Sequence, residues 1–251
     1  MNENKVHYFK ESEQMREAYR KAQDTFKYFW RELYWERHRV IPALSMVAVK
    51  VLFTQEDKGE HMWIDDVDFD GFNITGVLMN VPEKLTNVAQ GDTVNVELDE
   101  ITDWLFSFGE YDGNKVYGGF TVQVLRASMS EEERQQHDEA WGLDFGDPNK
   151  ILLAHGQEEH PENLIEHPMS LNMRDKLREF LEANQNEINA KDEQGYTMLH
   201  REAVAGNRSC AEVLLEMGAN KTATTKDGHT AFDLANELKW EHMLAVLGSV
   251  N

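Results

Sequence analysis

Apolar residues recur at helical spacing over residues 12–38, where neither glycine nor proline interrupts the pattern. The recurring positions are Met15, Ala22, Phe26, Phe29, Trp30, Leu33 and Tyr34, and they predict one long amphipathic helix. Ser12 stands where a capping residue is expected, and Pro42 follows the end of the pattern. The aromatic C-terminal half of this helix either packs on a sheet or forms a contact surface for a partner.

Residues 43–126 show shorter periods that are typical of strands. The predicted strands are residues 43–53, 61–69, 72–80, 93–98 and 101–106, followed by a further extended segment at 115–126. Asp70-Gly71 predicts a hairpin turn, and the pair Gly118-Gly119 predicts a bend or a close approach of two backbones. The short connections predict a curved, mostly antiparallel sheet.

A charged helix is predicted over residues 128–141, with Ser130 and Glu133 at capping-box spacing. Residues 143–168 hold three of the five prolines and read as a connector. We therefore place a domain boundary near residue 160, which divides the chain into an α+β domain (residues 1–160) and a helical domain (residues 161–251).

The helical domain contains an internal repeat. The segments around Gly195-Tyr196-Thr197 and Gly228-His229-Thr230 are 33 residues apart, and VLLEMGANKTA lies between them at residues 213–223. This pattern resembles the ankyrin repeat, although Met198 and Ala231 stand where that family usually has proline. Residues 173–190 fit a degenerate first repeat that caps the stack, because Leu181 lies 33 residues before Leu214.

The resemblance to ankyrin repeats implies an all-α stack that binds proteins. It implies a structural role for Thr197 and His200. It also implies that the turn tips project from the edge of the stack and meet a partner there. The candidate protein-binding residues are Glu193, Gln194, Tyr196, Lys226, Asp227 and His229.

The N-terminal part carries a second resemblance. The motifs VAVKVLF, GEHMWIDDV, GVLMNVPE and QGDTVNVELDEITDW occur in this order over residues 43–105, and together they resemble the YegJ-like bacterial domain of unknown function. The chain is thus identified as C-terminal ankyrin repeats fused to a YegJ-like domain. No activity follows from this resemblance, but related small α+β domains are associated with bacterial toxin–immunity loci.

The net charge of the chain limits which classes of partner we expect. The chain has 25 basic and 46 acidic residues and a net charge of −21, which disfavours nucleic acid and anionic membranes as partners. Such a charge favours a basic protein partner, such as a toxin domain, or simply keeps the protein in solution. Residues 1–14 lack the apolar core of a signal peptide, and no run of 18 apolar residues occurs, so we expect a cytoplasmic protein.

Few residues suggest chemistry. Asp66, Asp68 and Asp70 resemble the start of an EF-hand loop, but Val77 occupies the twelfth position, where calcium needs a carboxylate; an acidic hairpin is the better interpretation. The spacing of His155, His160 and His167 does not suit zinc, so these are interpreted as loop or cap residues. Cys210 is the single cysteine, which excludes an intramolecular disulfide and favours a buried thiol.

One polar and aromatic cluster remains. On a strand, His61, Trp63 and Asp65 share one face, and Asp103 and Trp104 come close if their strands pair. A binding pocket or a structural network is favoured over catalysis, because no nucleophile motif or phosphate loop accompanies these residues. No catalytic residue, metal site or cofactor is predicted.

These observations favour a protein-binding protein, and an immunity protein that neutralises a cognate bacterial toxin by direct contact is its most specific form. Two alternatives stay open: a general scaffold or adaptor, and a hydrolase-type enzyme that uses the His61 region.

Overall fold

The computed structural model describes residues 12–248, so the prediction about a signal peptide at residues 1–14 falls almost entirely outside it. The predicted long helix is confirmed as α1, Glu13–Glu36, and the Ser12 hydroxyl accepts a hydrogen bond from the Met15 amide at 3.2 Å. No helix within the described residues is both long enough and apolar enough to cross a membrane.

The predicted antiparallel sheet is present and has six strands. They are β1 (Met46–Gln55), β2 (Lys58–Phe69), β3 (Asn73–Leu78), β4 (Thr93–Glu97), β5 (Ile101–Ser107) and β6 (Val116–Gly118). Their spatial order is β4-β3-β2-β1-β5-β6, and all neighbours are antiparallel. The chain therefore runs as a meander from β1 to β4, and β5 then pairs with the free edge of β1.

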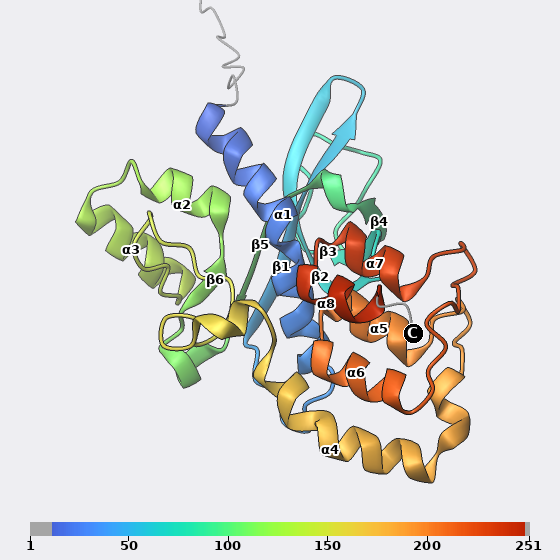
Figure 1. Ribbon diagram of the computed structural model, residues 1–251. Coiled ribbons are helices and arrows are strands. Elements are labelled where there is room, and N and C mark those ends of the chain that lie inside the picture. Colours follow the sequence, from blue (N-terminus) through green and yellow to red (C-terminus); the bar gives the residue numbers. More distant parts are fainter. Residues whose placement is uncertain (1–11, 249–251) are drawn as a thin grey trace, which may run out of the picture.

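The long helix α1 lies across one face of this sheet (Figure 1). Val49 is in register with Ile64 on one side and with Trp104 on the other, and all three side chains are fully buried. The Trp104 indole donates a hydrogen bond to the Ala22 carbonyl at 2.9 Å, and its ring lies 5.9 Å from that of Phe29. The side chains that alternate toward one face of the strands thus pack on the apolar stripe of the helix, and together they form the core.

Residues 115–126 were predicted as one extended segment, and this prediction is wrong. β6 ends at Gly118, and the helix α2 (Phe120–Arg126) follows. Gly118 has φ +82°, and a Cβ there would lie 2.1 Å from the Trp104 carbonyl oxygen. The predicted close approach of backbones is therefore confirmed. Asp103 accepts hydrogen bonds from the first amides of α2, at Phe120 and Thr121, which explains why a helix begins here.

The capped helix is confirmed as α3, Glu131–Trp141, with both hydrogen bonds of the capping box between Ser130 and Glu133. The connector then passes beside β6 through isolated bridges at Asp144 and Leu152 and includes a short 3-10 turn, Pro161–Leu164. Two further 3-10 turns, Leu98–Glu100 and Gly109–Asp112, flank β5.

Five helices follow: α4 (Pro168–Ala183), α5 (Met198–Ala205), α6 (Arg208–Glu216), α7 (Ala231–Glu237) and α8 (Glu241–Leu247), with a 3-10 turn at Gln185–Asn189. The repeated segments have the same local structure. Gly195 and Gly228 have φ +85° and +88°, and Thr197 and Thr230 are the N-cap residues of α5 and α7.

The structure does not show the all-α repeat stack that was predicted for the C-terminal part. The helices bury their apolar faces against one another and also against α1 and the turn between β2 and β3. The Trp35 indole of α1 donates to the Asn207 side chain at 3.0 Å, and a Cβ on Gly71 would lie 2.8 Å from Leu234. One cluster of buried apolar residues runs from Ala18 to Leu247, across the boundary predicted near residue 160.

Candidate binding site

The five residues of the predicted pocket do not converge. Lys50 lies between Trp63 and Asp103 in the sheet register, and its ammonium is 5.1 Å from the Trp63 ring centroid. Trp104 belongs to the opposite face, under α1. Asp65 pairs with Val77 on β3, away from Asp103. Trp63 and Asp103 therefore flank Lys50 on neighbouring strands, while Trp104 lies on the other face of the sheet.

Hydrogen bonds within the protein surround the Asp103 carboxylate. It is fully buried, and its carboxylate accepts hydrogen bonds from the Trp104 amide, the Phe120 amide and both the amide and hydroxyl of Thr121 at 2.5–2.9 Å. Burial raises the pKa of Asp103, while the Thr121 hydrogen bonds and the Lys50 charge oppose this rise. The four donors hold this carboxylate in place at the start of α2.

His61 lies apart from Asp103. Its Nδ1 is 3.1 Å from the Thr102 hydroxyl, and its Nε2 is 3.3 Å from the Tyr19 hydroxyl on α1. The ring therefore links the β1–β2 hairpin to the N-terminal half of α1. Neither of the two grooves described below is lined by His61, Trp63, Asp65, Asp103 or Trp104.

The acidic residues at the end of β2 form a hairpin, as the sequence predicts. Asp68 pairs with Arg37 at 2.7 Å, and the Asp70 carboxylate accepts from the Phe72 and Asn73 amides at 2.8 and 2.7 Å.

Within residues 12–248, no group of three or more His, Cys, Asp or Glu side chains is arranged to hold a metal ion. His167 caps α4, since its ring accepts from the Met169 amide.

The predicted turn tips are only partly exposed. Tyr196 is 6% exposed, and its hydroxyl donates to the Asp70 carbonyl at 2.7 Å. His229 packs on Phe72, with ring centroids 4.4 Å apart. Both side chains therefore meet the β2–β3 turn of their own chain, and the expectation that Tyr196 projects from the edge is wrong. Glu193, Gln194, Lys226 and Asp227 are exposed, and their role in protein binding stays a prediction.

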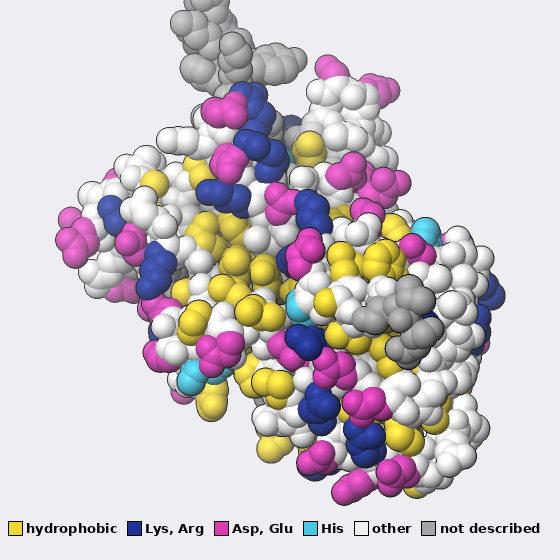
Figure 2. Space-filling view, in the orientation of Figure 1, with side chains coloured by type: hydrophobic (Ala, Val, Ile, Leu, Met, Phe, Trp, Pro, Cys, Tyr) yellow, Lys and Arg dark blue, Asp and Glu magenta, His cyan; other side chains and the backbone are white. Residues whose placement is uncertain are grey.

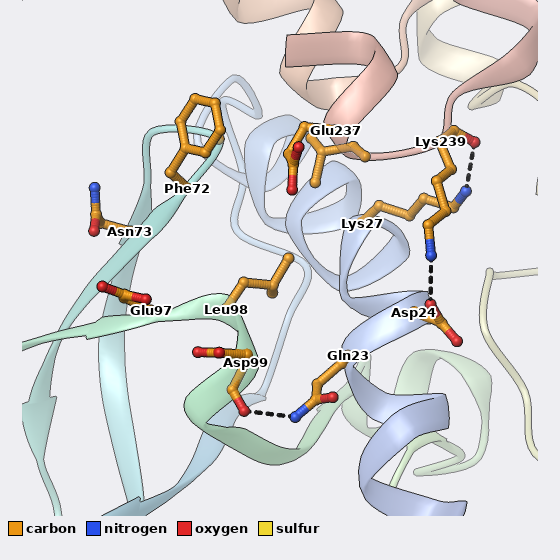
Figure 3. Close-up of a pocket in the computed structure, with 12 residues that line it drawn as sticks. Gln23, Asp24, Lys27, Phe72, Asn73, Glu97, Leu98, Asp99, Glu237 and Lys239 are labelled. Carbon is orange, nitrogen blue, oxygen red and sulfur yellow. Dashed lines mark hydrogen bonds and ion pairs between the residues drawn. The ribbon is translucent and has the colours of Figure 1, made fainter. Parts of the chain in front are cut away.

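Acidic side chains are spread over the face shown in Figure 2, while apolar side chains gather in its middle. A groove of about 520 Å³ opens where the sheet, α1 and the α7–α8 connection meet. We call it the acidic groove. Figure 3 shows its walls: Phe72, Asn73, Glu97 and Asp99 come from the sheet side, Gln23, Asp24 and Lys27 from α1, and Glu237 and Lys239 from the C-terminal helices.

The two lysines of the acidic groove are engaged within the protein. Lys239 forms an ion pair with Asp24 at 2.8 Å. Lys27 donates to the Lys239 carbonyl at 2.9 Å, and its ammonium lies 4.7 Å from the Trp240 ring centroid. Burial lowers the pKa of Lys27, and the neighbouring charges of Lys239 and Arg31 add to this effect. These contacts tie α1 to the α7–α8 connection.

Three carboxylates of the acidic groove have no such partner. Glu97, Asp99 and Glu237 are exposed and form no ion pair with any residue that the structure describes. Half-buried Phe72 and Leu98 lie among them. The groove thus offers negative charge next to a small apolar surface, which suits a basic segment that also carries an apolar side chain.

The acidic groove was not predicted from the sequence. Its residues come from four separate segments, at positions 23–27, 71–73, 97–99 and 237–239. No motif links them. The one available signal was the acidic pair Asp99-Glu100 between two predicted strands, and it gave no indication of which segment lies opposite.

Comparison with known proteins relates this chain to bacterial proteins. The chain belongs to the family DUF2314, described as an uncharacterized protein conserved in bacteria, which matches residues 12–145. Over 98% of its length, the chain is 48% identical to a protein of Neisseria meningitidis serogroup B named "Putative ankyrin repeat protein", and the alignment covers 98% of that protein. It is also 33% identical over 89 residues to the "Uncharacterized protein YegJ" of Escherichia coli K12, covering 36% of this chain and 56% of that protein.

These findings correct the identification made from sequence, which was ankyrin repeats fused to a YegJ-like domain. The family match extends from α1 to residue 145, well beyond the motifs at residues 43–105. The C-terminal helices do not form an all-α stack, because they complete the core that α1 and the sheet begin.

Proposed function

We propose that this chain is a protein-binding protein and that its acidic groove takes a basic segment of the partner. The observation that carries the proposal is the set of three carboxylates without an ion-pair partner among the described residues, Glu97, Asp99 and Glu237, around Phe72 and Leu98. Lys or Arg side chains of a partner would pair with the carboxylates, and an apolar neighbour would cover Phe72.

The charge of the whole chain supports the same partner chemistry. A net charge of −21 attracts a basic protein over a distance and speeds its encounter. The name of the Neisseria relative also supports protein binding, because repeat proteins use extended surfaces to bind other proteins. Neutralisation of a basic toxin domain in the cytoplasm is the most specific form of this proposal.

The test is capture of partners from a lysate of the organism that makes this protein. The bait is the full chain, compared with a groove variant that carries Glu97→Lys, Asp99→Lys and Glu237→Lys. A control variant carries Asp175→Lys, Glu179→Lys and Glu182→Lys on α4, where the same three charges are reversed at exposed positions. Circular dichroism confirms that all three proteins are folded.

We expect the wild type and the α4 control to retain one dominant basic protein, and the groove variant to lose it by tenfold or more. Retention should weaken as salt rises, because the contacts are charged. Equal capture by the groove variant would refute the acidic groove as the binding site. A captured protein that is toxic when expressed alone, and harmless with this chain, would support the immunity role.

A further inference from the structure

A second groove lies between the C-terminal half of α1, α4 and α5, and it shares no residue with the acidic groove. Its volume is about 650 Å³, which is within the range of small-molecule sites. Trp30 of α1, Leu177 of α4 and Met198 of α5 line it. Because these residues come from both parts of the chain, the groove exists only when α1 and the C-terminal helices are joined.

The rim of this α1–α4–α5 groove is basic, in contrast to the rest of the chain. Arg37, Lys176 and Arg201 all line it. Arg37 is paired with Asp68 at 2.7 Å and Arg201 with Asp192 at 2.5 Å. Lys176 is exposed and forms no ion pair with any described residue. One ammonium is therefore left to bind an external anion.

A buried carboxylate limits the charge of that anion. Glu202 lines the groove and accepts hydrogen bonds from the Tyr34 hydroxyl and the Asn207 amide, both at 2.8 Å. A doubly charged head group, such as phosphate, would place two negative charges beside this buried acidic group, with only one free ammonium to balance them. A head group with a single negative charge fits better.

The Trp30 side chain, which lines this groove, also carries an unsatisfied donor. The indole Nε1 of Trp30 is buried and has no hydrogen-bond partner within residues 12–248. Buried polar groups are nearly always hydrogen-bonded, and an exception calls for an explanation. Of the three such atoms in the described chain, the other two belong to Asp112 and Arg126, which do not line the groove.

We propose that the α1–α4–α5 groove binds an aliphatic monocarboxylate, with the carboxylate at Lys176 and the alkyl chain along Trp30, Leu177 and Met198. The site is independent of the protein-binding role, since it depends on different residues.

The experiment is isothermal titration calorimetry of the full chain with decanoate, kept below the concentration at which it forms micelles. We expect one binding site per chain. Hexanoate should bind about 100-fold more weakly, since it buries four fewer methylene groups. Decan-1-ol and decylamine should bind at least tenfold more weakly than decanoate, because the first lacks the charge and the second reverses it.

Substitutions of lysine residues test whether decanoate binds at Lys176. Lys176→Ala should weaken decanoate binding about tenfold, the loss of one charge-assisted hydrogen bond, and Lys176→Arg should restore most of it. Lys226→Ala removes an equally exposed charge elsewhere and should change nothing. Absence of decanoate binding, equal binding of decan-1-ol, or an unchanged affinity in Lys176→Ala would each overturn the proposal.

Discussion

At the scale of single residues, Gly118 leaves no room for a side chain, because a Cβ there would lie 2.1 Å from the Trp104 carbonyl oxygen. We expect Gly118→Ala to lower the free energy of unfolding by about 3 kcal/mol or more, because a Cβ would overlap the Trp104 carbonyl. Gly113→Ala is the matched control: Gly113 has φ +78° and open space around the added Cβ, so it should cost only about 1–2 kcal/mol for the left-handed backbone. Urea unfolding measures both, and equal costs would contradict this explanation.

Glu202 gives the second prediction at this scale. Burial raises its pKa to about 7, although hydrogen bonds from Tyr34 and Asn207 favour the charged form. The folded state therefore holds a proton that the unfolded state releases near pH 4.5. Stability from this group is present below that pH and is lost as pH rises through about 7.

We expect the wild type to lose up to about 3 kcal/mol between pH 5 and pH 8 from this residue. Glu202→Gln carries no such titration, so its stability should change less over the same range. Urea unfolding of both proteins at the two pH values gives the comparison. The same change in both would show that Glu202 does not titrate as described. Other titrating groups, such as the buried His200 and the half-buried His242, are common to both proteins and cancel.

At the scale of elements, α1 is held between the sheet and the C-terminal helices. The Tyr28 ring of α1 packs edge to face on the Trp240 ring at the start of α8, with centroids 5.5 Å apart. The Trp240 indole donates a hydrogen bond to the Val204 carbonyl of α5 at 3.1 Å. One aromatic residue thus joins three helices that are far apart in sequence.

A double-mutant cycle measures this joint. Trp240→Ala should cost about 3–5 kcal/mol, as expected for a buried tryptophan, and Tyr28→Ala should cost less because Tyr28 is half-buried. The double variant should lose about 0.5–1.5 kcal/mol less than the sum of the two single losses, which is the energy of an aromatic pair. Full additivity would mean that the two rings do not interact. Phe232→Ala, at an exposed position of α7, serves as a control with little effect.

At the scale of the whole molecule, one apolar core extends from α1 to α8. We expect the fragment of residues 1–160 to fold poorly, because Trp30 and Trp35 would lose the cover of α4, α5 and α6. The full chain should unfold in one cooperative transition. Near-ultraviolet circular dichroism and urea unfolding of the fragment test this. A sharp transition in the isolated fragment would instead support the domain boundary near residue 160.

The elements that the sequence predicted correctly have local causes. The apolar stripe from Met15 to Tyr34 predicts α1, alternation predicts β1 to β5, and the spacing of Ser130 and Glu133 predicts the cap of α3. Cys210 was expected to be buried and is 2% exposed. Each of these follows from the period of the backbone or from a contact within a few residues.

The errors have distant causes. The segment Phe120–Arg126 is a helix because Asp103, 17 residues before Phe120, accepts hydrogen bonds from the Phe120 and Thr121 amides. Tyr196 is buried because the β2–β3 turn comes to it from more than 120 residues away. The acidic groove and the α1–α4–α5 groove likewise bring together segments that no motif connects.

The sequence by itself thus determined α1, the strands β1 to β5, α3, the acidic charge and the repeated turn–helix segment, because these depend on composition and on neighbours along the chain. Only the tertiary structure decided which face each C-terminal helix buries, that α1 lies between the sheet and those helices, and where the two grooves open. Hydrophobic burial is not directional, so a pattern of apolar residues shows that a face is covered but not which segment covers it.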